Sequence, residues 1–227
     1  TPFADAFTAA AKALVIDSKA DVMLFRDPIG NSRAQIDAAI RFRATAVVAL
    51  DFLFWFGYGT LDARGGPIDS EAERLELLER GLGYLAELEC PLLIGDFPDM
   101  SAAVGKMLSA AQMPARSTLP LLSKRVREWA AERGHTTVVP LSELVLQLGA
   151  KTELKIGRHL FPAGTRLLQY DELHPTLQGL AATAQLVCAE LVRLDLAKEA
   201  DFDFELAGVL GKLGAEPLPL PAKSGVR

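Results

Sequence analysis

The chain has 227 residues, an apolar fraction of 50%, a charged fraction of 23% and a formal net charge of −5. This composition excludes an intrinsically disordered chain, and the acidic charge without any basic run argues against a nucleic-acid partner. The longest wholly apolar runs, over 46–50 and 52–56, are far shorter than the roughly 18 residues that span a bilayer.

A chain of this length predicts one large domain over residues 1–215, followed by a Pro-rich tail over 216–227. Cys90 and Cys188 lie in apolar stretches and are expected to be buried free thiols. Two such cysteines do not decide whether the protein is exported or cytoplasmic. The sequence does not indicate an oligomeric state.

Apolar β-branched runs alternate with helical patterns along the chain, which is typical of a parallel sheet covered by helices. We therefore predict an α/β fold of three α/β/α layers around a doubly wound, mostly parallel sheet. In chain order, the pattern predicts a helix over 2–14, a strand over 20–25, a turn over 27–30, a helix over 32–43, a strand over 45–54, a helix from Asp69 or Ser70 to about Glu89, a strand over 91–95, a helix over 118–133, a strand over 136–139, a helix over 175–194 and a last helix over 202–213.

The beginning of this pattern is unusual for a doubly wound fold. A parallel crossover needs about a dozen residues, so residues 14–18 are too close to the strand at 20–25 to form a separate neighbouring strand. The chain then opens with a helix where such folds ordinarily open with a strand. We therefore expect a central strand before Thr1.

The segment with the clearest chemical signal is Tyr170-Asp171-Glu172-Leu173-His174-Pro175. An aspartate three residues before a histidine, on a turn that ends at a helix start, can place its carboxylate against one imidazole nitrogen. His174 would then accept a proton from a hydroxyl nucleophile, while Asp171 fixes its tautomer. The alternative is a histidine that only packs near the helix start.

The stretch DELHPTLQG resembles the last block of the SGNH (GDSL-type) hydrolases, which reads Asp-x-x-His-Pro and is followed by Thr and Gly. The resemblance spans most of residues 20–180 and implies an ester hydrolase with Asp171 and His174 in its catalytic triad. Gly30, in DPIGNS, is similar to the second-block glycine whose backbone N–H contributes to the oxyanion hole. VVALDFLFWFGYG occupies the place of the third block, and PLLIGDFPDM resembles the fourth strand.

The third block departs from the family pattern because it contains no asparagine. Asn31 is the only asparagine of the chain, and the residue most similar to the family's oxyanion donor is Asp51. A charged carboxylate would repel a developing oxyanion, so Asp51 fits this role only when protonated. A structural role for Asp51 is the alternative.

No Gly-Asp-Ser sequence, which carries the nucleophile of the family, occurs in the chain. Ser18, in Ile16-Asp17-Ser18, follows the first predicted helix, whereas the family's nucleophile precedes that helix. Ser32 follows Gly30 closely and is expected to cap the next helix. The resemblance thus places the nucleophile before Thr1, on the strand that the crossover length also indicates.

An aromatic run follows the second predicted strand and consists of Phe52, Phe54, Trp55, Phe56 and Tyr58. Part of this run is expected to belong to the core and the rest to wall the substrate pocket, with Trp55 and Tyr58 as the binding residues. Residues 98–117 are expected to form either a lid over this edge of the sheet or a packed surface segment. Asp96 and Asp99 follow a strand end and are expected to cap turns, with a cation site as the alternative. His135 and His159 lack ligand spacing with His174, so no metal site is expected. Gly81-Leu82-Gly83 lies inside a helical pattern and does not follow a strand, so no nucleotide cofactor is expected either.

These observations favour a serine-dependent ester hydrolase that acts on a small-molecule ester. An alternative is a binding protein that keeps the SGNH fold and has lost hydrolysis, which would suit the missing asparagine and serine. A further alternative is an acyltransferase that uses the same residues with an alcohol as acceptor.

Overall fold

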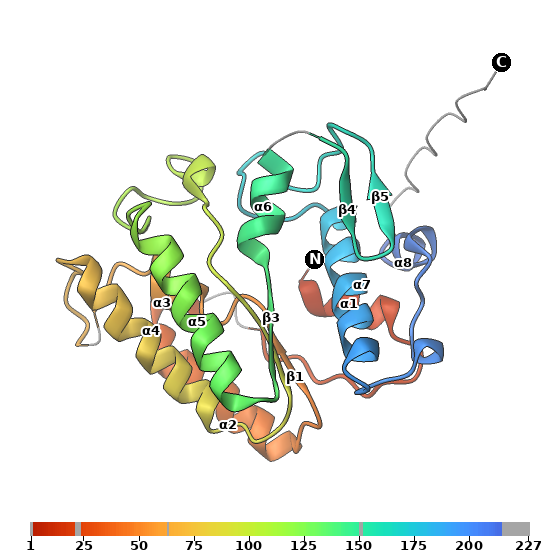
Figure 1. Ribbon diagram of the computed structural model, residues 1–227, viewed down its shortest axis with the longest axis horizontal. Coiled ribbons are helices and arrows are strands. Elements are labelled where there is room, and N and C mark those ends of the chain that lie inside the picture. The colour runs from red at the N-terminus through yellow and green to blue at the C-terminus, as the bar shows by residue number, and fades with distance from the viewer. Residues whose placement is uncertain (1, 21–23, 63, 150–151, 215–227) are drawn as a thin grey trace. The chain divides into compact units, whose positions relative to one another are not determined.

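The computed structural model describes residues 2–20, 24–62, 64–149 and 152–214 (Figure 1). They form two compact units. The sheet unit comprises the described parts of 19–146 and 171–173, and the helical unit those of 1–18, 147–170 and 174–227. The tail predicted over 216–227 lies outside the described residues, and the single domain over 1–215 stays a prediction.

Three parallel strands form the centre of the sheet unit. They are β1 (Val47–Ala49), β2 (Leu92–Gly95) and β3 (Thr136–Val139), paired in the order β1-β2-β3. The strands predicted over 91–95 and 136–139 are therefore confirmed. The strand predicted over 45–54 is shorter, because the chain turns after Ala49 and enters the short helix α3 (Phe54–Tyr58).

After α3 the chain forms α4 (Glu71–Ala86) before it enters β2, and α5 (Thr118–Arg133) lies between β2 and β3. Right-handed crossovers in one direction place both helices on the same face of the sheet. The helix α2 (Pro28–Phe42) packs beside α4, which also contacts α5 (Figure 1). The mixture of helices and strands and the parallel three-stranded sheet agree with the predicted α/β class, whereas the doubly wound, three-layer arrangement stays a proposal.

Local capping explains where these helices begin. The Ser70 hydroxyl accepts a hydrogen bond from the Glu73 N–H, and the Glu73 carboxylate accepts one from the Ser70 N–H, which confirms the predicted start of α4. At α2 the turn predicted over 27–30 is wrong. Asp27 is the N-cap and Pro28 the first helical residue, so this stretch is the first turn of the helix.

The core of the sheet unit lies between the sheet and the helices. Gly81 of α4 allows α3 to approach, because a Cβ at this position would stand 2.9 Å from side-chain atoms of Leu53 and Phe56. Apolar side chains from the strands and helices fill the core, among them Phe56, Leu78, Leu82, Leu85, Leu92, Ile94, Leu122 and Val126.

The helical unit contains α1 (Phe3–Ala10), α7 (Leu177–Arg193) and α8 (Leu206–Lys212), with a 3-10 turn at Glu199–Asp201. The helix α1 packs against α7 and α8. It is shorter than the predicted helix over 2–14, because Ala11 becomes extended and forms an antiparallel bridge with Phe202. The helices predicted over 175–194 and 202–213 are confirmed with later starts.

Other elements differ from the sequence prediction. The strand predicted over 20–25 is wrong at its described end, where Leu24–Arg26 form a 3-10 turn, while residues 21–23 lie outside the described part. The helix α6 (Leu141–Gly149) and the antiparallel strands β4 (Leu154–Ile156) and β5 (His159–Phe161) were not predicted. Within the described ranges, no helix combines the length and apolar character needed to span a membrane.

Candidate functional site

The carboxyl ends of β1, β2 and β3 meet at one edge of the sheet, because the strands are parallel. In open α/β sheets this is the edge where ligands bind. Asp51 lies just beyond β1, Asp96 directly follows β2, and Ser142 lies just beyond β3. This edge is therefore the first place to look for a functional site in the sheet unit.

Asp96 is buried at this edge and has three hydrogen-bond donors. Its Oδ1 accepts from the Ser142 N–H at 2.8 Å, and its Oδ2 accepts from the Ser142 Oγ at 2.6 Å and from the Arg127 Nη1 at 2.8 Å. The carboxylate thus caps the first turn of α6 and ties it to α5, which is the capping role expected from the sequence.

Asp99 also caps a turn, because its Oδ1 accepts from the Ser101 N–H at 2.9 Å. Among the residues that the structure describes, no group of three or more histidine, cysteine, aspartate or glutamate side chains could hold a metal ion.

Asp51 differs from Asp96 because it is exposed to solvent by surface area. Desolvation by the surrounding protein nevertheless raises the pKa of its carboxyl above the ordinary value for aspartate. A carboxyl with a raised pKa keeps its proton to a higher pH, and a protonated carboxyl can donate a hydrogen bond. The direction of this shift is the one that a donor role for Asp51 needs.

The aromatic run forms a chain of ring contacts in the sheet unit. The Tyr58 ring stacks on Phe54 with centroids 4.1 Å apart, Phe54 meets Trp55 edge-on at 5.0 Å, and Trp55 contacts Phe25 at 5.6 Å. Tyr58 is fully buried, whereas Phe54 and Trp55 are half-buried and Phe25 is exposed. A ligand can therefore meet this run through Trp55, with Tyr58 supporting it from the interior.

The Tyr58 hydroxyl is used inside the protein. It donates to the Pro98 carbonyl oxygen and accepts from the Met100 N–H at 3.2 Å. Burial raises the pKa of this phenol well above its ordinary value, so Tyr58 stays protonated over the physiological range.

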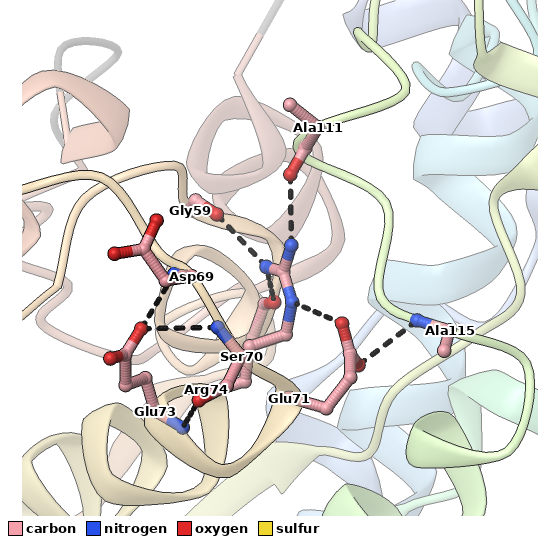
Figure 2. Close-up of polar contacts among 9 residues, drawn as sticks. Gly59, Asp69, Ser70, Glu71, Glu73, Arg74, Ala111 and Ala115 are labelled. Carbon is pink, nitrogen blue, oxygen red and sulfur yellow. Dashed lines mark hydrogen bonds and ion pairs between the residues drawn. The ribbon is translucent and has the colours of Figure 1, made fainter.

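Arg74 is a buried cation that the sequence did not single out (Figure 2). Its guanidinium donates to three carbonyl oxygens, of Gly57 at 2.7 Å, Gly59 at 2.9 Å and Ala111 at 2.8 Å. Its Nε also donates to Glu71 Oε1 at 3.2 Å, and the other oxygen of Glu71 accepts from the Ala115 N–H at 3.0 Å. Arg74 thereby connects the end of the aromatic run to the segment over 98–117.

The segment over 98–117 is packed onto the sheet unit. Ala103, Leu108 and Pro114 are buried, and Arg74 and Glu71 hold its second half (Figure 2). Of the two arrangements expected for this segment, the structure shows the packed one.

Gly30 lies in the first turn of α2, and its backbone N–H donates to Asp27 Oδ1 at 2.9 Å. An oxyanion at this N–H would have to displace the Asp27 carboxylate. The helix start itself favours negative charge, since its N–H groups carry partial positive charge. The role of Gly30 as an oxyanion donor stays a prediction.

His174 lies on a tight hairpin of the helical unit. Leu168 and Pro175 form an antiparallel bridge, the Gln169 N–H donates to the His174 carbonyl at 2.7 Å, and the Thr176 N–H donates to the Leu167 carbonyl at 2.9 Å. Thr176 then caps α7 through its hydroxyl, which accepts from the Gly179 N–H at 3.2 Å. The His174 residue is exposed at the end of this backbone pairing.

The three residues before His174 belong to the sheet unit. Asp171 Oδ1 accepts from the Leu173 N–H at 2.9 Å, and Glu172 adopts a left-handed conformation with φ of 58°. Lys106 Nζ lies 3.6 Å from Glu172 Oε1, and Leu173 packs against the core of the unit. A non-glycine residue at positive φ persists where its surroundings hold it, as at functional sites.

The two serines considered from the sequence have different surroundings. Ser18 is exposed. Ser32 is fully buried inside α2, and its hydroxyl has no hydrogen-bond partner among the described residues. The prediction that Ser32 caps the helix is wrong, because Asp27 does so.

Sequence reasoning missed Arg74 and the strain at Glu172. Arg74 follows Ser70 by four residues in an acidic, amphipathic helix, and nothing in that pattern distinguishes it from an exposed arginine. The conformation of Glu172 had no sequence signal, because the left-handed region is more usual for glycine or asparagine.

No protein-family model matches this sequence, and no curated protein matches it either.

Proposed function

We propose that this protein is a serine-dependent ester hydrolase that uses Asp171 and His174 as its acid–base pair. The observation that carries the proposal is the fixed conformation of the segment around this pair. Asp171 Oδ1 accepts from the Leu173 N–H, Glu172 adopts a left-handed conformation, and the His174 carbonyl accepts from the Gln169 N–H. These features restrict the backbone conformation from Asp171 to His174. Such a restraint is expected where a carboxylate must orient an imidazole.

In this reaction His174 accepts the proton of a serine hydroxyl while the serine oxygen attacks the ester carbonyl. The tetrahedral intermediate breaks down as His174 returns the proton to the leaving alcohol, which gives an acyl-enzyme. In the second half of the reaction, His174 accepts a proton from water while the water oxygen attacks the acyl group. His174 then returns this proton to the serine oxygen, and the carboxylic acid is released. From the resemblance to SGNH hydrolases we expect the serine before Thr1, and the exposed Ser18 is the alternative, because Ser32 is fully buried inside α2.

The oxyanion hole that we propose combines the Gly30 N–H with a protonated Asp51. Desolvation raises the pKa of Asp51, which is the direction that this donor role needs, and a developing negative charge nearby would raise it further. The aromatic run supports an apolar acyl or aromatic group in the substrate, with Trp55 as its contact and Tyr58 behind it. The substrate is thus a small-molecule ester.

A binding protein without hydrolysis is the second candidate. It is favoured by the hydrogen bond from the Gly30 N–H to Asp27 Oδ1, which occupies the donor that hydrolysis needs. An aspartate in place of the family's asparagine at position 51 points the same way.

Fluorophosphonate labelling of the full-length protein separates these candidates. We expect one adduct on a serine, mapped by peptide mass, and loss of labelling in His174→Ala. The matched control is His135→Ala, because His135 is also exposed and lies at the opposite end of β3 from the candidate edge. Folded protein that takes no adduct would reject the hydrolase and leave the binding protein. If an added alcohol outcompetes water for the acyl group, the protein is an acyltransferase instead.

A further inference from the structure

The hairpin that carries His174 also carries an arginine stacked on a tyrosine. The guanidinium carbon of Arg166 lies 3.3 Å from the centroid of the Tyr170 ring. Both residues are exposed, Tyr170 to 82% of its surface, so the stack faces solvent. An arginine in van der Waals contact with a ring face is held in one orientation and loses little entropy when it binds.

Only one nitrogen of the Arg166 guanidinium donates a hydrogen bond to a described residue. Its Nε donates to the Leu168 carbonyl oxygen at 3.2 Å, and no carboxylate pairs with Arg166 within the part of the chain that the structure describes. Arg158 of the same unit provides the contrast. It also lies over a ring, that of Phe204 at 4.1 Å, but its Nη1 is bound to Glu199 Oε1 at 2.6 Å.

The hairpin geometry brings this cation toward His174. Thr176 Oγ1 donates to the Arg166 carbonyl at 3.2 Å and the Gln169 N–H donates to the His174 carbonyl at 2.7 Å, so residues 166–169 run alongside 174–176. Tyr170 follows Gln169 directly. Since the Arg166 side chain reaches from its own backbone to the Tyr170 ring, its guanidinium lies at the end of the hairpin where His174 is located.

We propose that Arg166 and Tyr170 form a binding site for an anionic oxygen group, a carboxylate or phosphate, on the substrate. The remaining N–H groups of a guanidinium match two oxygens of such a group. This inference rests on the proposed function, because it assigns His174 to ester cleavage. It adds that the preferred ester carries a negative charge.

The test compares two esters that differ only in this charge, para-nitrophenyl hexanoate and the mono-para-nitrophenyl ester of adipic acid. We expect kcat/KM to favour the adipate ester by about tenfold, the low end for a charged hydrogen bond at an exposed site. Arg166→Gln should abolish this preference by lowering kcat/KM for the adipate ester about tenfold. Arg158→Gln, the matched control, should keep it. An unchanged preference in Arg166→Gln would overturn the inference.

A second readout does not depend on catalysis. Phenylglyoxal modifies exposed arginines, and peptide mapping measures the extent at each position. Adipate, with inorganic phosphate in a parallel sample, should protect Arg166 in the full chain and leave Arg158 unchanged. Protection by only one of the two anions identifies which is bound, and protection by neither refutes the site. If neither ester is hydrolysed, the proposed function has failed, and protection alone decides the anion site.

Discussion

Replacing Arg74 with methionine should destabilise the sheet unit strongly. The substitution keeps an unbranched apolar stem and removes every donor, so the carbonyls of Gly57, Gly59 and Ala111 lose their partner. The first two hydrogen bonds are buried. Each unsatisfied buried carbonyl costs about 1–3 kcal/mol, which predicts a total loss of about 4 kcal/mol.

Urea unfolding followed by tryptophan fluorescence measures this loss. The chain has two tryptophans, Trp55 and Trp129, and both belong to the sheet unit, so the signal reports that unit. For a chain of this size the expected loss corresponds to a decrease in Tm of about 8–16 °C. Arg74→Lys should recover only part of the stability, because one ammonium group does not span three carbonyls.

Arg125→Met is the matched control. Arg125 makes two hydrogen bonds to Glu79, at 2.6 and 2.9 Å, but this pair lies at the surface. Removing it should cost less than about 1 kcal/mol. If Arg74→Met costs no more than Arg125→Met, the three carbonyls find other partners, and the connection that we assign to Arg74 is refuted.

Three further predictions concern other polar groups of the sheet unit. Ser70→Ala removes the hydroxyl of the capping box of α4 and should cost about 1 kcal/mol in urea unfolding, whereas the neighbouring Asp69→Ala should cost less. Asp96→Ala leaves the first turn of α6 without its acceptor and should cost about 2–3 kcal/mol, and a cost near zero would show that water replaces the carboxylate. Asp51 should make stability depend on pH. The pKa of Asp51 is raised in the folded state, so the folded protein binds the proton more tightly than the unfolded chain. Protonated Asp51 therefore contributes stability at low pH. This contribution is lost as the pH rises from about 4, the ordinary pKa of aspartate, through the folded pKa. Asp51→Asn should remove this dependence and be more stable than the wild type at neutral pH, and parallel pH profiles of the two proteins would contradict the shift.

Much of the sheet unit could be predicted from the sequence because its signals are local. Thr118–Arg133 and Thr136–Val139 were predicted with the observed bounds, since period and composition change sharply at Ser117 and Gly134. The start of α4 was predicted from Ser70, whose capping acts within one turn of helix. The motif of Asp171 and His174 was also visible as a pattern of residue types, although its chemistry remains a proposal.

Other features were decided only by tertiary structure. Leu24–Arg26 have the apolar character of a strand, yet form a 3-10 turn directly before Asp27 caps α2. The burial of Arg74 depends on carbonyls at residues 57, 59 and 111, which lie far away along the chain. The stack of Arg166 on Tyr170 requires the hairpin to fold first. Capping and periodicity act over a few residues and can be recognised in the sequence, whereas tertiary packing determines which groups contact a buried charge.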